Sequence, residues 1–162
     1  MTALAFAESR NAALAAAGTR EFVTVLIGSQ LFGFEVTEIH DVFSLQDLTP
    51  VPGARGEIAG VLNLRGRIVT AIDTRRRLGL PGRTEGFAGM MAVGIEHDGE
   101  AYGLLVDEVG DVMRLADSAF EPNPVNLDPH WKTLSRGVYR LDGRLMLTLD
   151  IDRLLSVAVP SA

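Results

Sequence analysis

The chain has 162 residues, a net charge of −6 and no cysteine, and 47% of its residues are hydrophobic. This length allows one domain, or two small barrels packed together, with a real core. The lack of cysteine excludes disulfides, thiolate metal sites and thiol nucleophiles, and it fits a reducing compartment. The acidic balance argues against a general nucleic-acid binder. No apolar run approaches the ~18 residues of a membrane helix.

The N-terminal segment is a poor signal peptide. It lacks a basic start, and Glu8 and Arg10 interrupt its alanines. We therefore expect a flexible tail over residues 1–20. A second short tail is expected over residues 158–162.

Five short apolar runs follow the first tail, and turn residues separate them. Gly28-Ser29 and Arg65-Gly66-Arg67 are tight turns in which glycine can adopt positive φ. The prolines around Val51 end the third run, because proline cannot serve a central ladder. The predicted strands are Phe22–Ile27, Gln30–Val36, Asp47–Val51, Ile58–Leu64 and Arg67–Ile72.

The second half of the chain repeats the first. Phe32–Val42 matches Tyr102–Val112, and Gly60–Leu78 matches Gly137–Leu155 in the same order. Two independent matches in one order argue for a duplicated module. The strands predicted for the second copy are Met90–Ile95, Glu100–Val106, Val109–Leu115, Arg136–Leu141 and Arg144–Leu149.

The number and spacing of these strands predict an all-β fold of two five-stranded β-barrels side by side. The barrels are expected over about 21–85 and 86–157, with exchange of a terminal strand between them left open. Each copy also ends in a predicted helical turn, Thr74–Leu78 and Ile151–Leu155. Asp73 and Asp150 are placed to cap these two turns.

The turn at Arg65 is the most informative local feature. Arg65 corresponds to Asp142 in the second copy, whereas the next two residues recur unchanged. We infer that the turn tolerates either charge, so that Arg65 is there for function. The recurring residues are interpreted as structural parts of the turns: Gly66, Arg67, Gly143 and Arg144.

The sequence offers little for catalysis. His40, His97 and His130 are scattered, and no serine elbow or phosphate loop occurs. Asp150 and Asp152 form a DxD pair, but a capping role accounts for Asp150. We therefore predict that the chain is not an enzyme and needs no metal or cofactor.

Two binding functions remain as alternatives to protein docking. Seven of the fourteen arginines fall between Arg55 and Arg83, which allows an RNA-binding double barrel. That hypothesis lacks the exposed aromatic residues that base stacking needs. A barrel that binds a small ligand in its groove is the second alternative. Apolar side chains rimmed by charge between two barrels instead favour a docked protein helix.

A resemblance to a known family supports the docking hypothesis. The segment EIAGVLNLRGRIVTAIDTRRRLGL, residues 57–80, resembles YIxGVxNLRGxIVPxIDLRxxFGL, the signature of the CheW family of bacterial chemotaxis adaptors. The first hairpin and the second half of the chain also match, so that the resemblance covers about Glu21 to Leu155. Thr70 and Thr74 stand where the family usually has proline and leucine.

The resemblance implies SH3-like barrels without catalytic activity. It implies an adaptor that couples methyl-accepting chemoreceptors to the histidine kinase CheA in cytoplasmic arrays, at membrane-associated or cytoplasmic receptors. The implied partners are the regulatory domain of CheA, the cytoplasmic receptor tip and other copies of the adaptor in rings, with no nucleic acid and no direct membrane contact. The residues that it implies for receptor binding are Val36, Ile39, Asp41, Arg65 and Met91.

Overall fold

The structure is a computed structural model, and it describes residues 18–83 and 85–157. In chain order its elements are β1 (Thr19–Ile27), β2 (Gln30–Glu35), η1 (Val36–Glu38), β3 (Asp41–Ser44), β4 (Ile58–Leu64), β5 (Arg67–Asp73), α2 (Thr74–Arg77), β6 (Met91–His97), β7 (Glu100–Val106), β8 (Glu108–Ala116), η2 (Asp117–Ala119), α3 (Pro129–Leu134), β9 (Ser135–Leu141), β10 (Arg144–Leu149), α4 (Ile151–Leu154) and η3 (Leu155–Val157). Residues 1–17 and the predicted tail over 158–162 lie outside the described residues. The first tail was expected to reach residue 20, but β1 already begins at Thr19.

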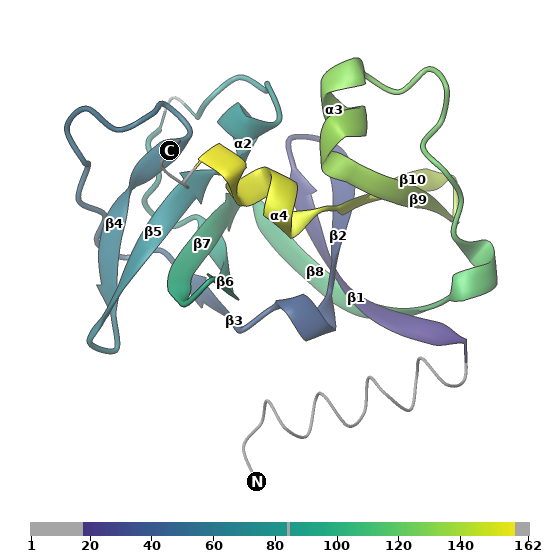
Figure 1. The fold of residues 1–162 in the computed structure, drawn as a ribbon, viewed down its shortest axis with the longest axis horizontal. Coiled ribbons are helices and arrows are strands. Elements are labelled where there is room, and N and C mark those ends of the chain that lie inside the picture. Colours follow the sequence, from purple (N-terminus) through teal and green to yellow (C-terminus); the bar gives the residue numbers. More distant parts are fainter. Residues whose placement is uncertain (1–17, 84, 158–162) are drawn as a thin grey trace, which may run out of the picture.

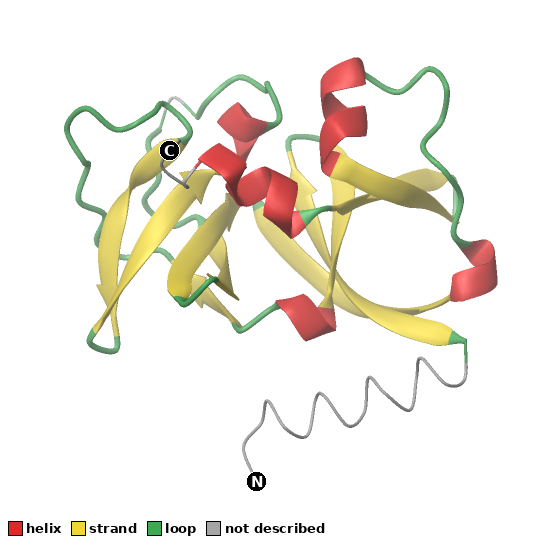
Figure 2. Ribbon diagram, viewed as in Figure 1, coloured by secondary structure: helices red, strands yellow, loops and turns green. Residues whose placement is uncertain are grey.

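The strands form two five-stranded sheets that lie side by side (Figure 1). The first barrel has the strand order β8-β1-β2-β10-β9, and the second has the order β3-β6-β7-β5-β4. Strands dominate both barrels, and only short helices connect or border them (Figure 2). The predicted all-β fold with two five-stranded barrels is therefore confirmed.

The second barrel is one contiguous stretch of the chain, from β3 to β7, whereas the first combines strands from both ends of the chain. The first barrel joins β1 and β2 to β8, β9 and β10, and the second joins β3, β4 and β5 to β6 and β7. Two parallel pairs, β2 with β10 and β5 with β7, link the copies. The ranges 21–85 and 86–157 thus describe the two copies of the repeat and not the two barrels. The exchange is larger than one terminal strand, because two strands of each copy enter the barrel of the other.

The two barrels have equivalent strand pairing, as the repeat predicts. Val23 pairs with Val112 in the first barrel, and the matching residues Val93 and Val42 pair in the second. The parallel pairs between the copies are equivalent in the same way. Isolated bridges after β8 and after β3 also occur at matching positions of the two barrels. The matched segments therefore share one topology.

The third strand of the first copy differs from its prediction. It covers Asp41–Ser44, where each residue pairs with β6, and not Asp47–Val51. The predicted segment contributes only a bridge between Thr49 and Val61. Pro50 and Pro52 flank Val51, and neither has the amide hydrogen that a longer ladder would require.

The largest hydrophobic core lies between the barrels. The hairpins β1–β2 and β6–β7 both contribute buried side chains to it, among them Val25, Phe32, Ile95 and Leu104. Each barrel also has a smaller core of its own. That of the second barrel consists of Leu45, Leu62, Val69, Ala71, Met90, Ala92 and Leu105. That of the first barrel has only Phe22, Tyr139 and Met146 as buried members.

Both predicted helical turns are present and capped. Asp73 accepts a hydrogen bond from the backbone amide of Arg76 at the start of α2. Asp150 does the same for the amide of Arg153 at the start of α4. A carboxylate at this position satisfies an amide that the helix itself cannot. The capping role proposed for the two aspartates is confirmed.

The short helices also fasten the two barrels together, and α4 lies between the barrels in Figure 1. The indole Nε1 of Trp131 donates to the carbonyl of Leu78 at 2.7 Å. His130 Nε2 lies 2.7 Å from the carbonyl of Arg77, which makes this ring nitrogen the donor. The Arg77 guanidinium donates in turn to the carbonyl of Leu154 at 3.2 Å. Side chains from neighbouring helices thus donate hydrogen bonds to backbone carbonyls at the ends of α2 and α4, which have no partner within their own helix.

Asp107 joins three elements at the boundary between β7 and β8. Its carboxylate accepts from Arg75 of α2 at 2.7 and 3.1 Å and from the amide of Gly28 in the β1–β2 turn at 2.7 Å. Burial alone would raise the pKa of Asp107. Hydrogen bonds from Arg75 and Gly28, together with the charge of Arg75, hold the pKa below its ordinary value.

We predict that Asp107→Asn lowers the free energy of unfolding by about 1–3 kcal/mol at pH 7, because it breaks a charge-assisted pair between elements. The folded pKa is depressed, so the contribution is present above the unfolded pKa of about 3.9 and is lost as the pH falls through the folded pKa. Denaturant titrations of both proteins should therefore converge towards pH 3. Asp142→Asn, at an exposed turn, is the control and should change little. An equal stability difference at pH 3 and pH 7 would contradict this role of Asp107.

Candidate functional site

The turn between β4 and β5 has a strained backbone. Arg65 has a φ of +53° and Gly66 a φ of +81°. Positive φ at both central residues matches the type I′ hairpin turn. Glycine adopts this conformation freely, whereas the left-handed region costs another residue about 1–2 kcal/mol. The amide of Gly66 donates to Asn63 Oδ1 at 3.0 Å, which helps to hold the turn.

The matching turn of the second copy has a different backbone. Gly143 has a φ of +75°, but among the described residues Asp142 does not have a positive φ. The inference that one backbone accepts either charge is therefore wrong. Arg140 takes the place of Asn63 in this copy, so the side-chain bond to the turn amide has no counterpart. Arg65 thus occupies a strained position, which is a reason to seek a function for it.

Arg65 reaches from the turn to the start of β3. Its Nη1 lies 3.1 Å from Asp41 Oδ2, while 73% of the Arg65 side chain stays exposed. An ion pair this exposed contributes little to stability. It does fix the direction of the guanidinium, most of whose planar set of donors still faces solvent. Two of the residues expected at a receptor site are therefore in direct contact.

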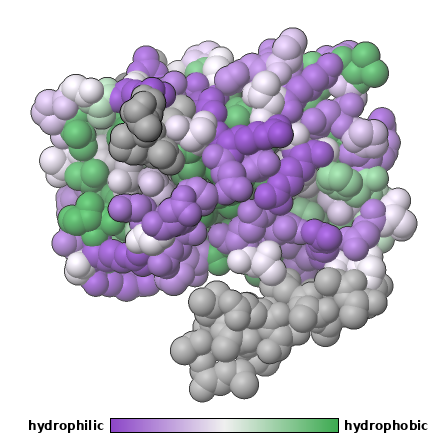
Figure 3. Space-filling view, in the orientation of Figure 1, coloured by the Kyte–Doolittle hydropathy of each residue, from purple (hydrophilic) through white to green (hydrophobic). Residues whose placement is uncertain are grey.

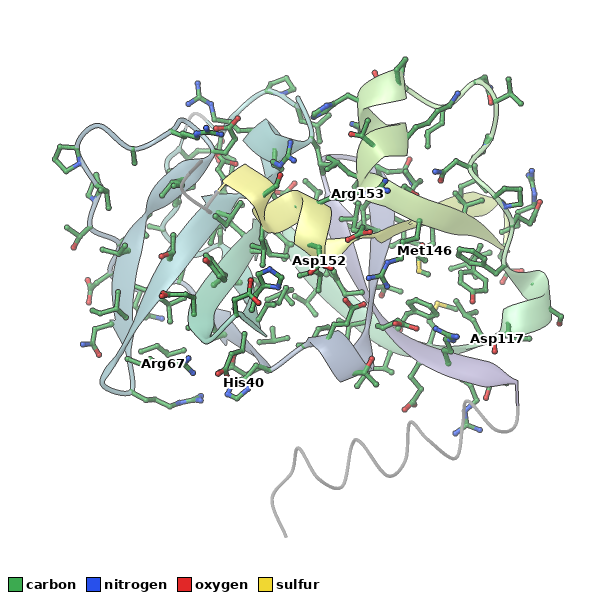
Figure 4. The ribbon with its side chains drawn as sticks, in the orientation of Figure 1. His40, Arg67, Asp117, Met146, Asp152 and Arg153 are labelled. Carbon is green, nitrogen blue, oxygen red and sulfur yellow. The ribbon has the colours of Figure 1, made fainter. Side chains whose placement is uncertain are left out.

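Arg67 points to another part of the second barrel, at the hairpin tip seen in Figure 4. Its guanidinium lies 3.3 Å from both carboxylate oxygens of Glu96, and it donates to the carbonyl of Gly99 at 3.2 Å. The hydrogen bonds from Arg67 lower the pKa of Glu96. Arg67 thus ties the β4–β5 hairpin to the β6–β7 hairpin. Its counterpart Arg144 makes no ion pair within the described part of the chain.

Arg65 and Arg67 border a hollow of about 150 Å³ in the second barrel. Asp41 and Glu96, their two partners, also line it, together with His40. His40 and Glu96 were not among the predicted site residues. The sequence does place His40 next to Asp41, but no pattern in it indicates that Glu96 lies beside this turn.

The apolar residues of the expected receptor site lie at a different place. Val36 on η1, Ile39 after it and Met91 at the start of β6 are half-buried and pack against the core between the barrels. Met91 lines a second hollow, of about 590 Å³, together with Val25 and Val109. Among the described residues, the five side chains therefore divide into an ionic pair and an apolar group.

Most of the cationic stretch is engaged within the protein. Arg75 pairs with Asp107, Arg76 donates to the carbonyl of Gly56, and Arg77 donates to carbonyls at the end of α4. These side chains are used for packing between elements, which leaves them poorly placed to contact phosphates. The stretch is a structural feature and does not favour the nucleic-acid hypothesis.

The histidines and the DxD pair also have local explanations. His97 lies 3.3 Å from both Asp98 and Asp152, so it links the β6–β7 turn to α4. Asp150 caps α4, and Figure 4 shows Asp152 on the same helix. No group of three or more possible metal ligands occurs within residues 18–83 and 85–157.

Comparison with known proteins identifies the fold. Residues 21–159 match the family model described as the CheW-like domain. The chain belongs to the CheW-like domain family. The chemotaxis protein CheW of Thermotoga maritima is 33% identical over 135 residues, which cover 83% of this chain and 87% of that protein. The chemotaxis protein CheW of Rhizobium meliloti is 27% identical over 135 residues, with 83% and 86% covered. The crystal structure of the scaffolding protein TtCheW from Thermoanaerobacter tengcongensis has a TM-score of 0.74 and 25% identity, and the match covers 85% of this chain and 92% of that one.

The resemblance noted in the sequence is confirmed by these matches. This CheW-like domain is a chemotaxis adaptor, a scaffold protein that is not an enzyme. The nucleic-acid and small-ligand alternatives for its main function are not favoured. Within the described residues, no helix is long and apolar enough to cross a membrane.

We predict that Arg65→Gly raises the free energy of unfolding by about 1 kcal/mol, because glycine removes the strain of the left-handed backbone. Asp98→Gly is a matched positive control, because Asp98 has a φ of +51° in the β6–β7 turn. Asp142→Gly, at the turn without that strain, should give no such gain. Denaturant titration of the three variants measures the effect. If Arg65→Gly and Asp142→Gly behaved alike, the strain at Arg65 would be disproved.

Proposed function

We propose that the chain couples chemoreceptors to the histidine kinase CheA, in cytoplasmic arrays at membrane-associated or cytoplasmic receptors. Its family and its scaffold fold support this role. The observation that carries the receptor side is Arg65, an exposed cation in a strained turn and paired with Asp41. An ion pair as exposed as that of Arg65 with Asp41, and a strained backbone at Arg65, contribute little to the stability of the second barrel.

The proposed receptor surface consists of Val36, Ile39, Asp41, Arg65 and Met91. Its ionic and apolar parts are connected along β6, where Gly94 pairs with Asp41 and Met91 pairs with Ser44. Three residues of a strand span about 10 Å. Two turns of an α-helix span about the same length. Asp41 lies over Gly94, so Met91, three residues away, points to the opposite face of β6. A receptor helix that contacts both parts must therefore pass across the edge strand β3, with its apolar stripe against the half-buried side chains and an acceptor near Arg65.

Arg65 would act as the polar anchor of this interface. Asp41 holds only one of its nitrogens, so the guanidinium can keep that partner and still donate to a carboxylate or backbone oxygen of the receptor. A planar fork of donors suits such shared acceptors better than an ammonium does. Prior orientation by Asp41 lowers the entropy lost on binding.

We predict that Arg65→Ala weakens binding to a receptor hairpin-tip fragment by about 1–3 kcal/mol, the range for a hydrogen bond to a charged group. The variant should fold normally, because the lost ion pair is exposed. Isothermal titration with the purified fragment measures the change. Binding to the CheA regulatory domain should stay within error, which separates the receptor site from the kinase site.

Arg67→Ala is the internal control for that measurement. Arg67 pairs with Glu96 and Gly99, so its loss should lower the melting temperature more than it weakens receptor binding. If Arg65→Ala instead unfolded the protein, and its folded fraction bound receptor normally, Arg65 would be a structural residue and the proposed site would be wrong.

The kinase side of the proposal has a separate test. The isolated CheA regulatory domain should bind this adaptor without receptor, at concentrations of tens of micromolar or below. Exposed apolar residues are the natural contacts for the kinase and for neighbouring copies in a ring, and Val125 is 93% exposed. Val125 lies in the loop between η2 and α3. Val125→Asp should weaken binding to the CheA regulatory domain or to a neighbouring adaptor copy, according to which partner contacts this loop. No binding between the purified domains would refute the adaptor's link to CheA.

A further inference from the structure

The first barrel has a hollow of about 330 Å³ at one end. Phe22, Tyr139 and Leu149 give it an apolar lining, with Phe120 at its side. Charged residues on several elements surround the opening: Arg20, Glu35, Glu38, Asp117 and Arg136. In Figure 4 Met146 lies within this barrel and Asp117 near its outer end. Figure 3 shows apolar atoms bordered by hydrophilic ones on the same barrel.

The second barrel has no such opening at the matching place, because apolar side chains fill it. The repeat aligns Arg20 with Met90 and Glu35 with Leu105, and the latter residue of each pair is 1% exposed. Thr148 likewise aligns with Ala71, which is fully buried. Since both barrels have equivalent strand pairing, the backbone accepts a dry, filled core at these positions. The hollow in the first barrel therefore results from its side chains and not from its fold.

The charged side chains form ion pairs between elements of the first barrel. Arg20 Nη1 lies 2.8 Å from Glu35 and its Nε lies 3.1 Å from Asp117, while Arg136 lies 3.2 Å from Glu38. Partly buried ion pairs seldom stabilise a fold more than apolar residues of similar size would. The second barrel demonstrates that apolar residues fit at the positions of Arg20 and Glu35, whereas Glu38 is matched by Glu108. The charges at the positions of Arg20 and Glu35 are thus better explained by a ligand.

The charge balance selects the kind of ligand. Three carboxylates but only two guanidiniums line the hollow. A fourth carboxylate, that of Asp150, lies 3.7 Å from Arg136 and also from Arg153. Burial raises the pKa of Glu38, and the nearby charge and hydrogen bond of Arg136 offset this only in part. The hollow can therefore accept another positive charge at its rim.

We propose that this hollow is a binding site for a small organic cation with an aromatic body, an arylalkylamine in chemical class. The ring would lie against Phe22, Phe120 and Tyr139, where edge or face contacts with aromatic rings are favourable. The ammonium would form ion pairs with the rim carboxylates, above all Glu38, and would contact the face of the Tyr139 ring. A volume of about 330 Å³ is at the lower end of the range for small-molecule sites, about 300–1,000 Å³. This site lies in the first barrel, and its acceptor Glu38 is on η1, which also carries Val36 of the proposed receptor surface.

The probe for a direct test is 2-phenylethylamine, with 3-phenylpropionate as the anionic analogue of similar size. Titrations followed by amide chemical shifts of the full chain should show millimolar or tighter binding of the amine, with shifts centred on Gly33, Phe120 and Tyr139. The anion should bind at least about tenfold more weakly. Equal affinity for both compounds would overturn the proposal. So would the absence of amine binding at an amine concentration of about 10 mM.

Variants separate the site from a structural ion network. Glu38→Gln should weaken the amine at least about tenfold, while Glu96→Gln, the acid of the Arg67 pair in the other barrel, should leave its affinity unchanged. The double variant Arg20→Met/Glu35→Leu copies the residues of the second barrel. It should fill the hollow, abolish amine binding and keep or raise the melting temperature. Unchanged amine binding in this double variant, or in Glu38→Gln, would overturn the proposed site.

Discussion

The packing of two hairpins against each other, β1–β2 of the first copy and β6–β7 of the second, is the contact on which the rest of the structure depends. Their buried side chains form the largest core, while the core inside each barrel is smaller. The hairpin β1–β2 belongs to a barrel completed by β8, β9 and β10, whereas the second barrel consists of the consecutive strands β3 to β7. The relative position of the barrels is therefore fixed by the same contacts that stabilise them, and a rigid surface between them follows.

This arrangement lets the side chains of the two barrels differ while the strand pairing stays the same. Corresponding strands keep their pairing, so that the side chains on them can change separately. The second barrel has the strained Arg65 at a hairpin tip and an apolar interior. The first has Asp142 at the matching tip and charged residues around its hollow. Duplication has thus given one scaffold two ends with different chemistry, whereas the shared core has stayed apolar.

The sequence predicts most of the strands, because apolar runs and glycine turns bound them, and it predicts both caps from Asp73 and Asp150. It misplaces β3, whose few residues, Asp41–Ser44, have no strong apolar alternation. The repeat does hold the missing signal, since β8 in the second copy matches that segment. The pairing of distant strands is not readable, because a parallel partner is chosen by tertiary packing. For the same reason the contact of Arg65 with Asp41 appears only in three dimensions, and its positive φ contradicts the backbone inferred from Asp142.

The interleaved topology also has a consequence for how the chain is made. During synthesis β2 has no pairing partner on one side until β10 has been made. Their contact includes a hydrogen bond from the Gln30 side chain to the carbonyl of Leu145, 115 residues apart in sequence. Synthesis at about 5–20 residues per second leaves the N-terminal hairpin without its partner for several seconds. During this time its apolar faces are exposed on the nascent chain, and early chaperone contact is advantageous. Contacts at such long separation also slow folding itself, and the first barrel can close only after β10 has left the ribosome.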